Sequence, residues 1–320
     1  MNWQPNAGPG IARARAGMLG RLRDYFAAAD VLEVTTPAVS ATTVTDPNIE
    51  SLHVQAENGR GFLQSSPEYY MKRLLAAGYP DIFQVAEVYR DGESGKRHLQ
   101  AFTLLEWYRI GFELEHIIAD TLALLRVMTD QLEQRTSVQL TYSQAFEDAT
   151  GLDPLSADSS ELADLLDADA DLRRALGDDR DAWLDLAMTT RVAASFPGER
   201  LTVITHYPAS QAALARLASD DPSVADRFEI FYGDLELANG FVELTDPDEQ
   251  KARFESDCER RRAVGQPAHA IDERLLAALA AGLPECAGVA LGLDRVLMID
   301  QALEDICKVR SFTPELRHDH

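Results

Sequence analysis

Two pairs of segments rich in β-branched and aromatic residues constrain the fold of this 320-residue chain more than any other feature. Residues 82–90 and 101–110 flank the polar loop DGESGKRHLQ, and residues 227–232 and 235–244 flank a Gly-Asp pair at 233–234. Each pair predicts an antiparallel hairpin, the first with a long loop and the second with a two-residue turn. An antiparallel sheet is therefore expected at the centre of the fold.

Helical patterns surround these hairpins. An apolar stripe from Ile11 to about Asp30 predicts a first helix, and the run from Asp246 to Glu249 has the N-cap, N1 proline and N3 glutamate of another. That second helix is expected to end near Gly265. The same reasoning predicts further elements, namely strands at 31–35, 60–64 and 201–205, helices at 67–75, 112–134, 143–195 and 272–281, and a strand entering a helix at 288–299.

Hairpins and helices alternate here without βαβ units, which predicts an α+β fold with an antiparallel β-sheet flanked by helices. Residues 1–10, with two Pro and two Gly, predict a flexible N-terminal arm. Residues 11–320 are expected to form a single catalytic domain.

Charge and composition restrict the class of protein. The formal net charge of −23 excludes a broad nucleic-acid-binding face, which needs clustered cations. Acidic residues concentrate in 151–200, where a solvated helical face is favoured over an acidic docking site. The chain has no run of eighteen apolar residues and no secretory leader, and its three cysteines are too few for a disulfide framework. A cytoplasmic protein without a membrane segment is expected.

The second strand of the first hairpin carries an unusual set of side chains. Strand periodicity puts Phe102, Leu104, Glu106 and Tyr108 on one face. A lone carboxylate is costly in a dry core, so the acid and the phenol suit a pocket for an amine ligand. A solvent-exposed face explains the pattern equally well.

The second hairpin brings two acids together. A turn at 233–234 pairs Phe231 with Glu236 and Tyr232 with Leu235, and Glu229 lies on the same face as Phe231. Two carboxylates so close repel each other unless a cation lies between them. Mg²⁺ held by one or two carboxylates together with substrate phosphates is the usual solution.

Glu243 has the opposite strand parity to Glu236. A bulge at Asn239-Gly240 would re-aim it, and the sequence leaves both possibilities open.

Phosphate-binding groups are present although no P-loop motif occurs. Arg90 ends a strand beside a basic loop, and Arg295 opens the last helix, but either arginine alone could equally be a surface residue.

Taken together, the motifs resemble the catalytic core of the class II aminoacyl-tRNA synthetases, lysyl branch. The segment ending in Thr35-Thr36-Pro37 is similar to motif 1, VYRDGESGKRHLQAFTLLEWY to motif 2, and GVALGLDR to motif 3. The stretches SSPEYYMKRLL and ELANGFVELTD most resemble the elongation factor P–lysine lysyltransferases, truncated paralogues of lysyl-tRNA synthetase. The resemblance runs from about Ile11 to Leu303, and 115–225 adds little to it.

The resemblance implies a role for each matching residue. Arg90 would hold the α-phosphate of ATP and Arg295 the γ-phosphate, and these two are the expected catalytic residues. The whole implied ATP site is Arg90, Asp91, Gly92, Glu93, His98, Leu99, Phe102, Glu236, Leu237, Gly292 and Arg295. The implied site for lysine or β-lysine is Ser66, Pro67, Glu68, Glu106, Tyr108, Asn239, Phe241, Glu243 and Ala290. Glu229 and Glu236 would carry Mg²⁺.

Three positions depart from the family pattern. In relatives an acid often occupies the second position after the motif 2 arginine, whereas here Gly92 holds that position and the acid is Glu93. Leu99 replaces a polar residue that contacts ATP in relatives. Ala290 stands where lysyl-tRNA synthetases typically have glycine. Its methyl group would reshape the pocket floor beside the substrate amino group, which favours a β-amino isomer.

The function expected from the resemblance is ATP-dependent activation of lysine, preferably (R)-β-lysine, and its transfer to a lysine of elongation factor P. Motif 1 starts within the first dozen residues, so no anticodon-binding domain is expected, and this disfavours tRNA as the acceptor. Motif 1 also implies a homodimer. Two alternatives stay open, a minimal lysyl-tRNA synthetase-like ligase with another acceptor and an inactive amino-acid-binding regulatory paralogue.

Overall fold

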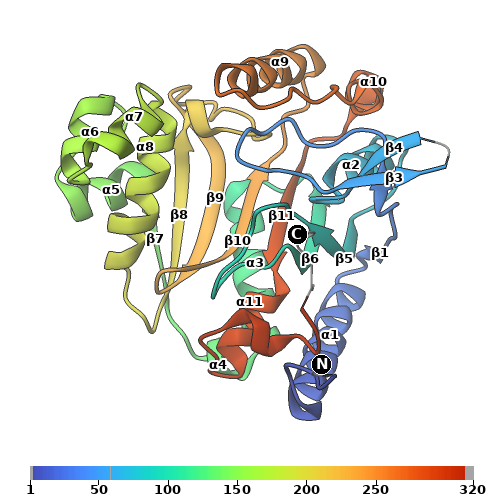
Figure 1. The fold of residues 1–320 in the computed structure, drawn as a ribbon. Helices are drawn as coiled ribbons and strands as arrows, with labels where there is room; N and C mark the ends of the chain where they lie inside the picture. The colour runs from blue at the N-terminus through green and yellow to red at the C-terminus, as the bar shows by residue number, and fades with distance from the viewer. Residues whose placement is uncertain (1–2, 58, 314–320) are drawn as a thin grey trace. The chain divides into compact units, whose positions relative to one another are not determined.

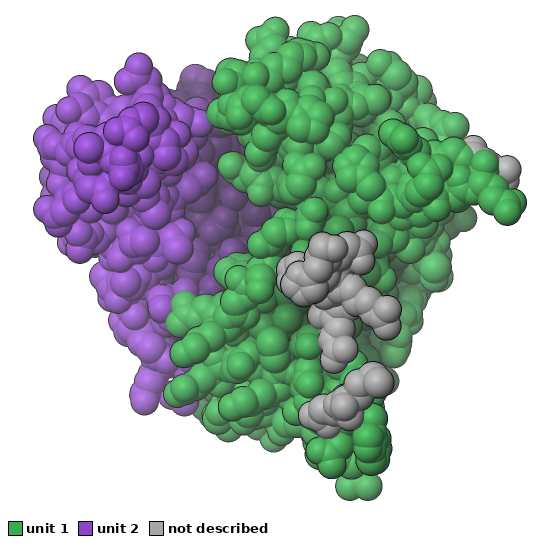
Figure 2. Space-filling model, viewed as in Figure 1, with its two compact units in different colours: residues 1–134, 245–320 green, residues 135–244 purple. Residues whose placement is uncertain are grey.

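The computed structural model describes residues 3–57 and 59–313. Residues 1–2 of the expected arm, and residues 58 and 314–320 of the expected domain, lie outside the described residues. The chain divides into two compact units (Figure 2), unit 1 with residues 1–134 and 245–320 and unit 2 with residues 135–244. The single catalytic domain expected over 11–320 stays a prediction, since a compact unit is not by itself a separate folding domain.

Unit 1 contains the first predicted hairpin, and the structure confirms it (Figure 1). Its strands β5 (Ile82–Tyr89) and β6 (Ala101–Ile110) pair antiparallel, and β11 (Cys286–Gly292) pairs antiparallel with β6. The short β1 (Leu32–Glu33) adds a parallel edge next to β5. A separate small sheet has the strand order β2-β4-β3. Its strands are β2 (Val39–Ser40), β3 (His53–Ala56) and β4 (Gly59–Leu63).

The helices of unit 1 lie in the predicted segments with shifted ends, with two exceptions. The helix predicted over 112–134 is interrupted at Thr129, whose backbone is extended, and the turn at 306–309 lies outside the predicted segments. The first helix starts at Pro9, because proline suits the first helical turn, and thus takes in the end of the expected arm. The remaining helices include short ones at 130–133 and 306–309. In order they are α1 (Pro9–Ala28), α2 (Glu68–Ala76), α3 (Leu114–Met128), α4 (Asp130–Glu133), α9 (Pro247–Ala263), α10 (Glu273–Gly282), α11 (Leu293–Asp300) and the 3₁₀ turn η4 (Ile306–Val309).

Helix α1 closes one face of the unit 1 sheet. Its apolar stripe is buried, and the Phe26 ring stacks on Phe83 of β5 with centroids 4.4 Å apart. Phe26 also contacts Trp107 of β6, which is fully buried. Because side chains alternate along a strand, Glu106 and Tyr108 lie on the opposite face of the sheet. That second face is the one on which a site can form.

Unit 2 contains the second predicted hairpin, which is also confirmed. Its strands are β10 (Leu235–Val242), β9 (Val224–Tyr232), β8 (Leu201–Pro208) and β7 (Ser137–Thr141), in that spatial order. Strand β9 is antiparallel to both neighbours, and β7 runs parallel to β8. The helical elements are α5 (Tyr142–Thr150), α6 (Ser159–Leu165), α7 (Ala170–Leu176), α8 (Arg180–Ala187), a π-helix (Met188–Val192) and 3₁₀ turns at Ala193–Ser195 and Ala209–Gln211.

The acidic stretch 151–200 has a structural explanation in unit 2. Three of its aspartates, Asp158, Asp169 and Asp179, are the N-caps of α6, α7 and α8, where each side chain accepts backbone N–H bonds. An N-cap acid satisfies orphan donors and complements the helix dipole. The architecture is α+β, as predicted. Within the described part of the chain, no helix is both long and apolar enough to cross a membrane.

Candidate functional site

In unit 1 the open face of the sheet gathers several predicted site residues. Glu106 of β6 lies directly opposite Gln84 of β5 and Ala290 of β11. On the same face, Phe102 and Ala290 pack against the buried cluster of Ala86, Val88 and Leu104. The strand parity expected for Phe102, Glu106 and Tyr108 is therefore confirmed.

Glu106 is the centre of a buried polar group. Its carboxylate accepts a 2.7 Å hydrogen bond from Ser66 Oγ and another of 2.7 Å from the Tyr108 hydroxyl, and the residue is only 2% exposed. Ser66 Oγ in turn accepts the backbone N–H of Glu68 at 2.9 Å, where Pro67 starts helix α2. Ser66, Glu68, Glu106 and Tyr108 thus come from separate segments of the sequence and meet in one place.

Lys72 belongs to this group, although sequence reasoning missed it. Its ammonium lies 2.6 Å from Glu68 Oε1, one turn away on α2, and the residue is 1% exposed. The i,i+4 spacing of Glu68 and Lys72 was the available signal, but such pairs are mostly surface pairs. Lys72 balances the charge of Glu68, whereas the hydrogen bonds to Glu106 come from neutral hydroxyls.

The environment of Glu106 changes its acidity. Burial, followed by the charge of Glu68, raises its pKa to about 8, and the Ser66 and Tyr108 hydroxyls and the Lys72 charge only partly oppose this. Such a carboxyl group lacks a full counter-charge of its own. An ammonium group brought by a ligand would supply that charge, so the group is suited to bind an amine.

Arg90 and Phe102 also meet in unit 1. The Arg90 guanidinium lies 5.1 Å from the centroid of the Phe102 ring, and its Nη1 is 3.5 Å from Glu93 Oε1. Its Nε is buried and has no hydrogen-bond partner among the described residues. Gly92, which lies between Arg90 and Glu93, has φ +76°, a conformation that favours glycine. This is a local reason why glycine replaces the acid of the family pattern at this position.

Arg295 meets His98 from the loop that follows Arg90. Arg295 Nη2 lies 2.8 Å from His98 Nε2, and its Nε donates to the carbonyl of Arg97 at 3.4 Å. Gly292 is the N-cap of α11 and precedes Arg295 by less than one turn. Leu99 is buried, so its apolar side chain serves the packing of the loop. One basic loop thereby brings both predicted phosphate-binding arginines into a single unit.

In unit 2 the β9–β10 register confirms the expected pairing of Phe231 with Glu236 and Tyr232 with Leu235. Glu229 and Glu236 therefore share a face. Burial, and next the charge of Glu236, raise the pKa of Glu229 to about 7, while Arg227 lowers it. Arg227 Nη2 lies 2.7 Å from Glu229 Oε1, a contact that the sequence analysis did not foresee.

A β-bulge re-aims the rest of β10. The register shifts between Glu236 and Ala238, so the extra residue is Leu237 and not the Asn239-Gly240 pair considered from the sequence. After the shift Asn239 lies opposite Glu229 and Phe241 opposite Arg227. Continuing this alternation, Glu243 returns to the face of Glu229 and Glu236, and it is 1% exposed.

The carboxylates of Glu229 and Glu236 in unit 2 fit a magnesium ion whose coordination is completed by phosphate oxygens. The charge of Glu236 raises the pKa of Glu229, and a cation between the two carboxylates would relieve the repulsion. Within residues 3–57 and 59–313, no group of three or more His, Cys, Asp and Glu side chains is arranged to hold a metal ion alone. A shared site with a nucleotide therefore suits these residues better than a protein-only site.

Comparison with known proteins decides the family. Residues 9–315 match the family model of the class II tRNA synthetases (D, K and N). The chain belongs to this family. It is 43% identical over 319 residues to the elongation factor P–(R)-β-lysine ligase of Salmonella gallinarum, with 97% of each chain covered, and 41% identical to that of Avibacterium paragallinarum, with 98% of each covered. The corresponding ligase of Klebsiella pneumoniae subsp. pneumoniae is also 43% identical. These matches place the chain among the elongation factor P–lysine ligases of the class II family.

The predicted site residues gather in two sets, one in each unit. Unit 1 brings together Ser66, Glu68, Glu106 and Tyr108 at one sheet face, and its basic loop follows Arg90 and contacts Arg295 of α11. Unit 2 brings together Glu229, Glu236 and Asn239. The roles of all these residues, and their convergence on one nucleotide, stay predictions.

Proposed function

We propose that this chain is an ATP-dependent ligase that activates lysine, preferably (R)-β-lysine, as an aminoacyl-adenylate and transfers it to a lysine ε-amino group of elongation factor P. The names of the 41–43% identical relatives support the acceptor and the amino acid. The observation that carries the proposal is the buried carboxyl of Glu106, held by Ser66 and Tyr108 and suited to bind an ammonium group.

Amino-acid recognition follows from this group. A neutral side chain in place of the substrate ammonium would lose the ion pair with ionised Glu106, which disfavours the wrong amino acid. The methyl group of Ala290 faces Glu106 across the β6–β11 ladder. It narrows the space beside the substrate amino group, and this supports the preference for the β-amino isomer.

In the first step the substrate carboxylate attacks the α-phosphorus of ATP. A P–O bond forms to the carboxylate, the bond to the β-phosphate bridge breaks, and pyrophosphate leaves. Arg90 would bind the α-phosphate oxygens, Arg295 the γ-phosphate, and Phe102 the adenine ring. Mg²⁺ held by Glu229 and Glu236 would neutralise phosphate charge. The protein contributes mainly position and fixed charge to this step.

In the second step the neutral ε-amine of the acceptor lysine attacks the adenylate carbonyl. A C–N bond forms, AMP leaves with the electron pair of the broken C–O bond, and the amine loses a proton to give an amide. No covalent enzyme intermediate is needed. We further propose that the protein works as a homodimer in the cytoplasm, consistent with its three free cysteines, and does not charge tRNA.

The test is an acceptor-labelling assay with radioactive lysine and (R)-β-lysine, each offered with elongation factor P and with bulk tRNA. Label is expected on elongation factor P, more from (R)-β-lysine, and none on tRNA. Glu106→Gln should abolish labelling, and Glu33→Gln, an exposed acid on β1, should not. Label on tRNA, or a Glu106→Gln variant as active as the parent, would overturn the proposal.

A further inference from the structure

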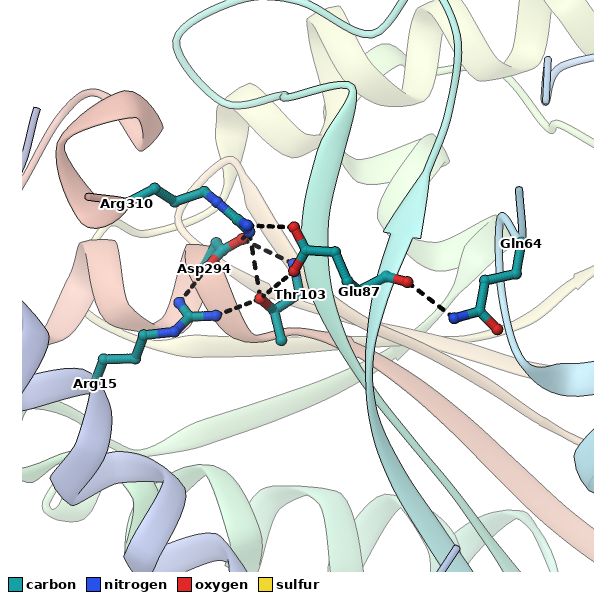
Figure 3. Close-up of polar contacts among 6 residues, drawn as sticks. All are labelled: Arg15, Gln64, Glu87, Thr103, Asp294 and Arg310. Carbon is teal, nitrogen blue, oxygen red and sulfur yellow. Dashed lines mark hydrogen bonds and ion pairs between the residues drawn. The ribbon is translucent and has the colours of Figure 1, made fainter. Parts of the chain in front are cut away.

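A second, partly buried polar cluster lies behind the site face of unit 1 (Figure 3). It consists of Asp294, Arg15, Arg310, Thr103 and Glu87, which we call the Asp294 cluster. Two cations and two anions balance each other in it. Its members come from α1, β5, β6, α11 and the segment after η4, so residues almost 300 positions apart meet at one point.

Asp294 is the most buried member, at 1% exposure. Its Oδ1 accepts from Arg15 Nη1 at 2.5 Å, and its Oδ2 accepts from Arg310 Nη1 at 3.0 Å. Its Oδ2 also accepts the backbone N–H of Thr103 at 2.9 Å. The β6–β11 ladder ends at the pair Leu104–Gly292. At Thr103, the residue of β6 before Leu104, the backbone N–H therefore bonds to the Asp294 side chain and not to a carbonyl of β11.

The other members hold Thr103 and its cross-strand neighbour Glu87 in place. Thr103 Oγ1 donates to Glu87 Oε2 at 3.2 Å and accepts from Arg15 and from Arg310. Arg310 also binds Glu87 Oε1, so its guanidinium bridges both anions. On the other side, Gln64 Nε2 donates to the Glu87 carbonyl at 2.9 Å, two residues before Ser66 (Figure 3).

No member of the Asp294 cluster belongs to the proposed substrate sites, but two members are covalently next to residues that do. Asp294 precedes Arg295, and successive helix residues differ by about 100°, so anchoring the Asp294 carboxylate sets the rotation of α11 and the direction of Arg295. Thr103 follows Phe102 and points to the opposite sheet face. The Asp294 cluster therefore sets the direction of the Arg295 side chain and the position of the Phe102 ring.

We propose that Arg15 and Arg310 are positioning residues for the nucleotide site, acting through Asp294 and Thr103 on Arg295 and Phe102. The proposal rests on the function proposed above, which makes those two residues ATP ligands. It assigns a role to α1 and to the segment around Arg310. The residues just before α1 also bond to that segment, since the Asn6 N–H donates to the Ser311 carbonyl at 2.7 Å.

The experiment compares Arg310→Gln and Arg15→Gln with the parent enzyme in ATP–pyrophosphate exchange. A misplacement of about 1 Å costs up to roughly 100-fold, so we expect KM for ATP to rise between 10- and 100-fold. KM for the amino acid should change less than twofold, since Glu106 and Ser66 do not touch the cluster. Arg310→Lys, which keeps the charge, should recover part of the loss.

The matched control is Arg23→Gln, also on α1, whose ion pair with Glu33 is exposed. It should leave both KM values unchanged. Equal rises in both KM values, or no rise in KM for ATP, would refute the positioning role. If Arg310→Gln does not fold, Arg15→Gln and Arg310→Lys give the same comparison.

Direct calorimetry with an α,β-methylene analogue of ATP separates this inference from the proposed function. A parent enzyme that binds the analogue but exchanges with neither lysine isomer would disprove the proposed function alone. In that case weaker analogue binding by Arg310→Gln still supports the positioning role, and unchanged binding overturns it.

Discussion

Substrate binding at Glu106 should release a proton. The pKa of this buried carboxyl is raised to about 8 in the protein, so at pH 7 the protonated form predominates. An ammonium ligand stabilises the ionised form and brings the pKa back towards its usual range. Binding of lysine or (R)-β-lysine at pH 7 is therefore expected to release up to about one proton.

Calorimetry in buffers of different ionisation enthalpy counts this proton. Affinity should rise by up to about tenfold per pH unit from pH 5 to 8 and level off above pH 8, because the ionised form of Glu106 is the binding form. Glu106→Gln should abolish the proton release and weaken binding by about 2 kcal/mol or more, at least roughly 30-fold. Glu33→Gln serves as the control.

The same group affects stability in the opposite sense. Because the folded-state pKa lies above the ordinary value near 4.5, the folded protein binds more protons than the unfolded chain between these two values. Stability of the empty protein should fall as pH rises through this window, by up to roughly 1.4 kcal/mol per pH unit. Glu106→Gln should remove this loss and be more stable than the parent at pH 8. Proton release near zero at pH 7, together with a flat stability profile, would refute the reasoning.

Three further predictions test other parts of the molecule. Ala290→Gly removes the methyl group that faces Glu106 and should lower the preference for (R)-β-lysine over lysine in kcat/KM by roughly 10-fold, measured by exchange; an unchanged ratio would exclude Ala290 as the determinant. Glu236→Gln should weaken Mn²⁺ binding in the presence of the ATP analogue by at least roughly tenfold in electron paramagnetic resonance, and equal binding would remove it as a ligand. Arg261→Ala breaks the hydrogen bonds of a fully buried guanidinium and should lower the free energy of unfolding in urea by about 3–5 kcal/mol. Arg260→Ala, at a more exposed neighbouring position, should lower it by under about 0.5 kcal/mol, and similar losses in the two variants would contradict this.

Both hairpins, and the register of the second beside its turn, could be predicted because they depend on short-range rules. A Gly-Asp turn and alternating side chains specify which residues lie opposite each other, so the pairing of Phe231 with Glu236 followed from the sequence. The faces of β6 followed from the same alternation. The Asp246 N-cap of α9 is equally local, and its two backbone bonds are present.

The bulge on β10 could not be placed from the sequence. An Asn-Gly pair is the usual local signal, yet the extra residue is Leu237, whose side chain is buried. A bulge forms where the partner strand and the core accept one more residue, and this depends on β9 and on packing. Its location decides whether Glu243 shares the face of Glu229.

The sequence alone predicted the two hairpins, the pairing beside the Gly-Asp turn and most helices, since each depends on neighbours within a few residues or across one turn. It did not predict the short strands β2, β3 and β7. The chemistry of the site came from the motif resemblance, and the residue roles stay predictions. Tertiary structure decided which acids are buried and with what partners. Burial raises the pKa of Glu106, and the tertiary fold buries the Glu68–Lys72 pair and joins Arg15, Asp294 and Arg310. Desolvation and ion pairing depend on atoms that approach from distant parts of the chain, and no local pattern encodes them.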